Sequence, residues 1–412
     1  MDVVYERWCG LDVHKKTVVA CLIAPGPGGG PTPEVRTFGT MTDDLLALGD
    51  WLAEAGCTPV AMESTGVYWK PVWNLLEGQF ELLLVNAQRI KAVPGRKTDV
   101  QDSEWIADLL RHGLLRPRFV PDREQRELRE LTRYRASLVR ERSREVNRLQ
   151  ETLEGANIKP AAVATDILGK SGHAILVELV SGTTDAAAMA GLARGELRTK
   201  LPELERALVG RFGAHQRFLV AQHLGHIDYL DEAIAALSAQ IAERLRPFDD
   251  QLERPDAIPG VGRYTAEVIV AEIGTDLSRF PTDRHLASWA GLCPGGHQSA
   301  GKRQSGKTRT GNRWLRTAPV EAATGAGRAR NTYLSAQYHR LAARRGKKRA
   351  AVAVAHSILV DAYHLLKHGT TFRDLGGDYF DRRDQDALER RLIARLEQLG
   401  NKVSVEKVEQ VA

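Results

Sequence analysis

The sequence predicts two fold classes in series, α/β in the N-terminal part of the chain and α over the remainder. Short apolar runs bounded by Gly and Pro alternate with amphipathic helical patterns up to residue 118. The segment 121–159 then reads as one long helix, and most of the chain after it has helical periodicity. These observations divide the chain into 1–118, 119–252 and 253–412.

The N-terminal segment has strand and helix patterns in a definite order. Predicted strands cover 8–15, 17–24, 34–40, 58–64 and 80–86, and predicted helices cover 42–56, 68–79 and 99–113. The order β-β-β-α-β-α-β-α describes a mixed sheet flanked by helices. It is also the layout of ribonuclease H-like nucleases, which enters here as an analogy of fold.

Composition limits the class of protein. The chain has 412 residues, 43% hydrophobic and 27% charged, with a net charge of +6, which is typical of a globular protein of two or three domains. Asp2 and Glu6 stand where a signal peptide would be cationic and then apolar, and no run approaches the roughly 18 apolar residues of a membrane span. We therefore expect a cytoplasmic protein.

The four cysteines do not have the spacing of a metal site. They lie far apart, without a Cys-x-x-Cys pair or a paired His nearby: Cys9, Cys21, Cys57 and Cys293. This pattern argues against zinc and for reduced thiols.

Four carboxylates occur at informative places in the N-terminal segment. Asp12 interrupts the apolar first strand, Glu63 ends the fourth, and Asp99 and Asp102 stand three apart at the start of the last helix, on one face. Taken singly, each could be a helix cap, a first-turn charge or a strand end. Converging together, they would repel strongly unless cations intervened. They therefore predict a site for Mg²⁺ or Mn²⁺, with two ions as in phosphoryl transfer.

The long helix of the middle segment is rich in arginine. Its arginines outnumber its acids, and Arg135, Arg142 and Arg144 are candidates for contacts with nucleic-acid phosphates. The alternative is that they pair with glutamates one turn away on the same helix. A second amphipathic helix, 226–245, could pack antiparallel against the first.

Residues 257–273, AIPGVGRYTAEVIVAEI, read as a helix-hairpin-helix element. In such an element the backbone at Gly260 and Gly262 would contact phosphates without reading bases. A tight turn between two helices, with glycine used for its positive φ, is the structural alternative.

The stretch 294–316, PGGHQSAGKRQSGKTRTGNRWLR, has no carboxylate. Its hydroxyls, Ser299 and Ser305, lie among cations that could hold a phosphodiester and neutralise charge on phosphorus. A plain basic loop that binds nucleic acid is the alternative. The cations are Lys302, Arg303, Lys307, Arg309, Arg313 and Arg316.

Several of these segments resemble one known family. GLDVHK, MESTGVYW and KTDVQDSEWIADLL are similar to the catalytic blocks of the DEDD transposases of the insertion sequence one-ten type, and 285–323 resembles their C-terminal transposase domain. The resemblance implies a RuvC-like N-terminal domain whose metal ligands are Asp12, Glu63, Asp99 and Asp102. It also implies that Ser299 is a nucleophile that becomes linked to a DNA phosphate and is brought to the metal site, with serine and metals in different domains of different subunits.

Together these features predict a Mg²⁺-dependent DNA transposase or site-specific recombinase. The resemblance further implies donor and target DNA as partners, a noncoding bridge RNA as guide, and a homo-oligomer, a dimer or tetramer, in the cytoplasm and on the nucleoid when bound to DNA. A RuvC-like junction nuclease that does not use Ser299 and a non-enzymatic nucleic-acid scaffold are the alternatives. A tyrosine recombinase using Tyr333 or Tyr338 would leave the carboxylates without a role.

Overall fold

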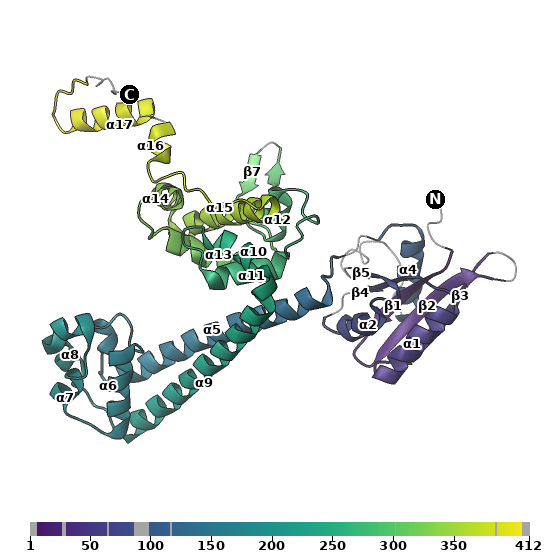
Figure 1. The fold of residues 1–412 in the computed structure, drawn as a ribbon, viewed down its shortest axis with the longest axis horizontal. Coiled ribbons are helices and arrows are strands. Elements are labelled where there is room, and N and C mark those ends of the chain that lie inside the picture. Colours follow the sequence, from purple (N-terminus) through teal and green to yellow (C-terminus); the bar gives the residue numbers. More distant parts are fainter. Residues whose placement is uncertain are drawn as a thin grey trace. The chain divides into compact units, whose positions relative to one another are not determined.

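A computed structural model of the chain describes residues 6–26, 30–63, 66–85, 99–115, 118–300, 302–383 and 385–405. The chain forms two compact units, Met1–Asp122 and Arg123–Ala412 (Figure 1). The first is an α/β unit and the second is almost entirely helical.

The first unit is built on a five-stranded mixed sheet of order β3-β2-β1-β4-β5. β1 pairs antiparallel with β2, β2 pairs antiparallel with β3, and the β1–β4 and β4–β5 pairs are parallel. All five predicted strands are confirmed, as β1 (Trp8–Val13), β2 (Thr17–Pro25), β3 (Pro31–Gly39), β4 (Pro59–Glu63) and β5 (Glu81–Val85).

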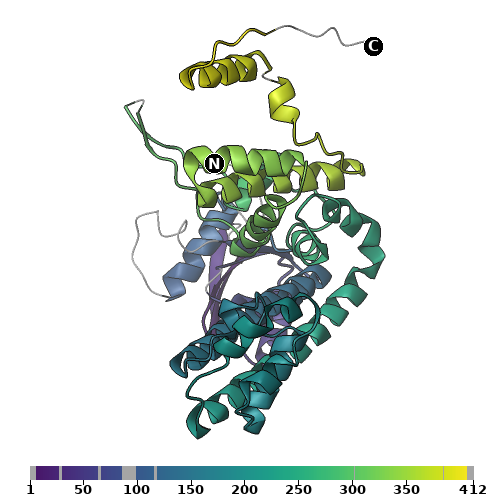
Figure 2. The ribbon, with the colours of Figure 1, turned by 90° about the vertical axis from the view of Figure 1, so that its left-hand side faces the viewer.

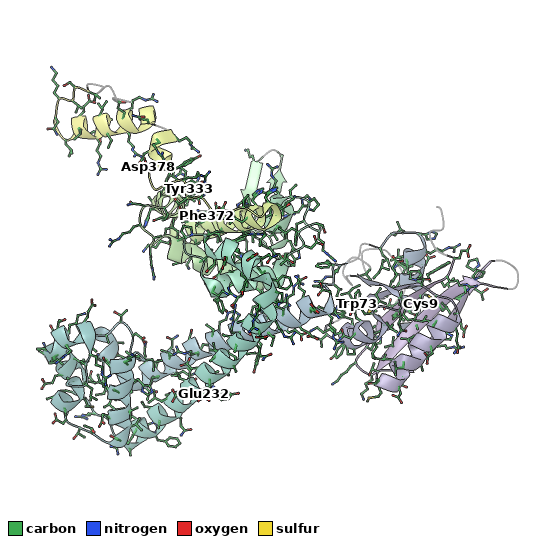
Figure 3. The ribbon with its side chains drawn as sticks, viewed as in Figure 1. Cys9, Trp73, Glu232, Tyr333, Phe372 and Asp378 are labelled. Carbon is green, nitrogen blue, oxygen red and sulfur yellow. The ribbon has the colours of Figure 1, made fainter. Side chains whose placement is uncertain are left out.

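Helices cover both faces of this sheet. α1 (Thr42–Glu54) and α2 (Trp69–Leu76) pack on one face, where Cys9 and Trp73 lie in a shared core (Figure 3). Pro71 is accommodated in α2 because it stands in the first turn, where a backbone N–H has no helical partner. α4 (Asp99–Arg111) covers the other face, above the smaller core that includes Trp8 and Ile106.

The second unit begins with two long antiparallel helices, α5 (Arg123–Gly155) and α9 (Ala214–Leu245), as the sequence predicted. Leu128 of α5 shares one core with Leu245 of α9, whereas Leu149 shares a second core with Val220. Both α5 and α9 thus contribute to both cores. The boundary predicted at residue 252, between a middle and a C-terminal domain, stays a prediction. The second core also contains the short elements between the two helices: η1 (Pro160–Ala162), α6 (Lys170–Ser181), α7 (Ala186–Ala190), η2 (Gly195–Lys200) and α8 (Leu201–Ala207).

The first core of this unit is organised around α15 (Lys347–His368), whose apolar residues are buried against several other helices. α15 is the one described helix that is long and apolar enough to cross a membrane, and more than half of its most apolar stretch is buried inside the protein. It is a core helix. The other elements are η3 (Arg246–Phe248), α10 (Asp249–Asp256), α11 (Arg263–Ile273), α12 (Asp283–Trp289), α13 (Arg313–Ala326), α14 (Tyr333–Arg345), α16 (Tyr379–Arg383) and α17 (Gln385–Gln398).

The structure has a β-hairpin where the sequence predicts a loop. β6 (His297–Ser299) and β7 (Lys302–Ser305) pair antiparallel and project from the surrounding helices in both views (Figures 1 and 2). The pairing continues toward the helices through the Pro294–Thr308 bridge and the Gly295 N to Lys307 O bond of 2.8 Å. We call residues 293–309 the serine hairpin.

The four cysteines are free thiols, as predicted. Burial raises the pKa of Cys21 and of Cys57 to about 12. Thiols with such a pKa stay protonated and unreactive near neutral pH, so these side chains serve packing.

Candidate catalytic centre and nucleic-acid interface

Two buried carboxylates lie at the C-terminal ends of neighbouring parallel strands. β1 and β4 pair with Leu11 opposite Met62, and Asp12 and Glu63 are the next residues on the two strands. Only 5% of Asp12 and 8% of Glu63 is exposed. Because side chains alternate along a strand, both carboxylates share the sheet face that α4 covers.

A glycine lets α4 approach this face closely. A Cβ at Gly10 would lie 2.4 Å from the carbonyl oxygen of Ser103 and 2.5 Å from the backbone nitrogen of Ala107, so any side chain there would push α4 away. Ser103 is fully buried, and the half-buried Asp102 precedes it. Asp99 lies one turn earlier on α4, and its side chain lies outside the described residues. The backbone thus places Asp12, Glu63 and the helix that carries Asp102 at the same face of the sheet.

The donor set suits a hard divalent cation. Carboxylate oxygens are the ligands that Mg²⁺ and Mn²⁺ prefer, and a cation would offset the repulsion of two buried acids on one face. Among the described side chains, no three His, Cys, Asp or Glu form a cluster able to hold a metal ion. His14 Nε2 lies 3.1 Å from Asp12 Oδ2, so the imidazole is a polar neighbour of this carboxylate.

In the second unit, Ser299 ends β6 and pairs with Lys302, so it stands at the far end of the serine hairpin. Ala300, which follows it, has a φ of 49°, a left-handed conformation that non-glycine residues seldom adopt. The side chain of Ser299 lies outside the described residues. Ser305 Oγ accepts a hydrogen bond of 3.1 Å from the backbone N of Lys307, so this hydroxyl has a local structural role.

The cations predicted to surround the serines differ in their exposure. Lys302, Lys307, Arg309 and Arg313 are exposed, and the side chain of Arg303 lies outside the described residues. Arg316 is half-buried and donates to Thr308 Oγ1 at 2.9 Å.

The three arginines singled out on α5 are not equivalent. Arg135 is 2% exposed, and its guanidinium lies 2.7 Å from Glu267 and over the ring of Tyr264. The prediction that it contacts phosphate is therefore wrong in this structure, because the group is buried and neutralised. Arg142 forms two hydrogen bonds to Asp231 of α9, which raise its pKa. Arg144 is exposed, as a phosphate contact requires.

The predicted helix-hairpin-helix is present in outline as α10, a short turn and α11. Gly260 has a φ of 86°, and a Cβ there would lie 2.3 Å from the backbone nitrogen of Ala326 on α13. The positive φ is what the structural alternative, a tight turn between two helices, requires, and the missing side chain also lets this turn pack closely on α13. Gly262 is exposed at the N-cap of α11.

Sequence reasoning missed a group of side chains at the base of the serine hairpin. Arg140 and Arg313 both stack on Trp314, with the guanidinium carbons 4.8 and 4.6 Å from the ring centroid. Beside them is a cavity of about 60 Å³ between α5, α11 and α13, lined in part by Tyr264 and by the buried Glu272. Two glutamates that interrupt the apolar run of α11 are the sequence feature that could have indicated this group. A carboxylate in a buried run needs a partner, so they predict cationic side chains packed against α11.

Two family models match separate parts of the chain. A transposase model of the DEDD type matches residues 9–158, and the model of the transposase IS116/IS110/IS902 family matches residues 254–340, so that together the two cover more than half of the chain. The chain belongs to this transposase family. A DEDD transposase domain thus coincides with the sheet that carries Asp12 and Glu63, and the second match contains the serine hairpin.

Named relatives agree with this membership. A probable family 20 transposase of Pseudomonas aeruginosa is 28% identical over 76% of this chain and 85% of its own length. The transposase for insertion sequence element IS1111A of Coxiella burnetii is 26% identical over 70% of this chain and 72% of its own. An insertion element IS116 protein of Streptomyces clavuligerus is 32% identical over 56% and 62%. This transposase therefore belongs to a class of enzymes that cleave and transfer DNA.

Proposed function

We propose that this transposase breaks and rejoins DNA strands with the help of Mg²⁺ or Mn²⁺, through a covalent bond between Ser299 and a DNA phosphate. The observation that supports the proposal best is the pair Asp12 and Glu63, buried on adjacent positions of parallel strands beneath α4. We further propose that the first unit is a ribonuclease H-like, RuvC-like domain, in keeping with its strand order.

The metal ligands in this proposal are Asp12, Glu63, Asp99 and Asp102. When bound, the divalent ions, two in number, would polarise the phosphodiester and stabilise charge on the leaving oxygen. The residues of the chain hold these ligands in place: Gly10 allows α4 to lie on β1, and the parallel β1–β4 pair sets Asp12 beside Glu63.

The serine step conserves the energy of the phosphodiester bond. Ser299 Oγ forms a bond to phosphorus and loses its proton, while the bond from phosphorus to one strand end breaks and that strand leaves with a hydroxyl. A hydroxyl of the exchanged strand then attacks the serine phosphodiester, which restores a DNA phosphodiester and returns the proton to Ser299. No external energy source is needed.

Cationic side chains would hold the nucleic acids. Lys302, Lys307, Arg309 and Arg313 are exposed near or within the serine hairpin, which has no carboxylate to repel a phosphate. We propose donor and target DNA as partners, a bridge RNA whose backbone the protein grips, and a homo-oligomer working in the cytoplasm on nucleoid DNA.

The decisive experiment incubates the protein with a cognate DNA and Mg²⁺ and looks for a protein–DNA adduct that survives denaturation. We expect the adduct in the wild type, and peptide mass after nuclease digestion should place the phosphate on Ser299. Ser299→Ala should abolish the adduct because it removes the bonding oxygen, while the charge of the hairpin is unchanged.

Ser305→Ala is the matched control, since it removes a hydroxyl of the same hairpin. It should retain much of the recombination activity. An adduct on Ser305 or on a tyrosine would refute the assignment, and metal-dependent nicks without any adduct would favour a junction nuclease instead.

A further inference from the structure

The base of the serine hairpin is tied to a fully buried carboxylate. Glu272, on α11, is 0% exposed. Arg133 of α5 donates to it through Nε and Nη2, at 2.7 and 2.8 Å, and Asn312 Nδ2 donates to the same carboxylate at 2.6 Å. One carboxylate therefore joins α5, α11 and the residue at which α13 begins.

Asn312 is where the returning strand of the hairpin meets the helices. Its backbone N donates to the carbonyl of Trp289 at 2.9 Å. Just before it, Gly311 lies so close to Gly291 that a Cβ at Gly311 would be 2.3 Å from the Gly291 nitrogen. The two ends of the hairpin thus meet at this point, and Gly291, with a φ of 72°, turns the chain into it.

The orientation of the Asn312 amide follows from its contacts. Oδ1 accepts from the backbone N of Trp314 and of Leu315, at 3.0 and 3.2 Å, and so caps α13. Because the oxygen faces these two donors, the NH₂ group must face Glu272. Asn312 thus caps the helix with one end and is anchored through Glu272 with the other.

A second buried ion pair joins the same two helices and, among the described residues, has no link to the hairpin. Glu267 of α11 is 4% exposed and lies 2.7 Å from Arg135 of α5. Its other described partner is Arg263 of α11, and no described contact joins it to residues 290–312. Glu267 holds the same helices together without touching the hairpin, which makes it a natural control.

We infer that Glu272 is a positioning residue, which fixes the base of the serine hairpin against α5 and α11 through Asn312. The inference rests on the proposed role of Ser299, because position matters to the reaction only if this hairpin carries the reacting hydroxyl. Catalytic hydroxyls need close placement, and a shift of about 1 Å can cost on the order of 100-fold in rate.

Asn312→Ser tests the contact most directly. Serine still offers an oxygen to cap α13, but its shorter side chain lacks the amide nitrogen that reaches Glu272. The substitution leaves both members of the Glu272–Arg133 pair unchanged. Without nucleic acid, we expect faster deuterium exchange of the backbone amides of 293–309 than in the wild type. With cognate DNA and Mg²⁺, we expect adduct formation to slow by about 10-fold or more, and DNA affinity to stay within about twofold because the phosphate-contacting cations are unchanged.

Glu267→Gln is the control, and Glu272→Gln with Asn312→Ser forms a double-mutant cycle. Glu267→Gln should leave exchange in 293–309 at the wild-type level, and Asn312→Ser should have a smaller effect when Glu272 is already glutamine. Wild-type exchange in Asn312→Ser, equal loosening in Glu267→Gln, or a wild-type adduct rate despite faster exchange would overturn the inference. Deuterium exchange is measured without DNA, so it tests the contact between Asn312 and Glu272 whether or not Ser299 forms an adduct. A wild-type protein that forms no adduct would overturn the proposed function but not this contact.

Discussion

Buried carboxylates occur in both units, but their neighbours differ. In the second unit, Glu272 is paired with Arg133, Glu267 with Arg135, and Glu145 with His223 at 2.6 Å. In the first unit, Asp12 and Glu63 share one face of the sheet on adjacent strands. An arginine that pairs with a single buried acid ties two helices together, whereas two carboxylates on neighbouring strands offer a set of oxygen donors to a divalent cation.

The serine hairpin and the start of α13 carry the opposite charge. Residues 294–316 contain six Lys or Arg and no Asp or Glu. Metal-binding acids would repel a phosphate, and a cation-rich hairpin would attract it. Acid and cation chemistry are thus carried by different units, and variants of each should fail in different ways.

The largest effect should come from the acids of the first unit. Asp12→Ala or Asp102→Ala should reduce strand cleavage by at least about 100-fold, the scale of removing one preorganised electrostatic group. Nucleic-acid binding should be nearly unchanged, because neither side chain contacts phosphate except through a metal. Cleavage assays with Mg²⁺ and binding assays measure the two effects separately.

Asp108→Ala is the matched control on the same helix. Asp108 lies on α4 with 47% of its side chain exposed, 3.6 Å from His112. The Asp108→Ala variant should cleave DNA at the wild-type rate. Undiminished cleavage by Asp12→Ala would remove the proposed metal site.

A half-buried acid with no cationic partner among the described residues should cost stability in the second unit, and Asp361 of α15 provides the case. Burial, with a smaller effect from the nearby charge of Asp374, raises its pKa from 3.8 to about 6. The folded protein therefore binds this proton more tightly than the unfolded chain, so stability falls as pH rises from about 4 to 6. Asp361→Asn should raise the free energy of unfolding near pH 8 by up to about 3 kcal/mol, since each pKa unit is worth about 1.4 kcal/mol.

That gain should shrink as pH falls through about 6 and vanish near 4. Denaturant unfolding at several pH values measures it, with Asp228→Asn, an exposed acid on α9, as the control. A gain that does not change with pH would mean that Asp361 is not protonated in this range.

Local patterns predicted more of the fold than of the contacts. The strands of the sheet can be predicted because they are apolar runs bounded by Gly and Pro. The sequence predicts a loop at β6 and β7 because HQS and KRQS lack the β-branched and aromatic residues typical of strands. The different roles of Arg135 and Arg144 could not be predicted, because the partner that buries Arg135 lies far along the chain, on α11. Gly260 was correctly expected to turn the chain, but its packing on α13 depends on tertiary structure.

The smallest effect should distinguish the arginines of α5 from one another. Arg144 is exposed, so Arg144→Gln should flatten the dependence of nucleic-acid affinity on salt by up to about 0.9 units of log–log slope on duplex, or about 0.7 on a single strand, equally across sequences. Arg142→Gln should leave the slope unchanged, because Asp231 already neutralises this group. Arg135→Gln should leave it unchanged too, while costing about 3–5 kcal/mol of stability by stranding the buried Glu267. Affinities measured over a salt series separate these cases.

An unchanged slope for Arg144→Gln would exclude this part of α5 from the interface, and a flattened slope for Arg142→Gln would mean that phosphate displaces Asp231 in the complex.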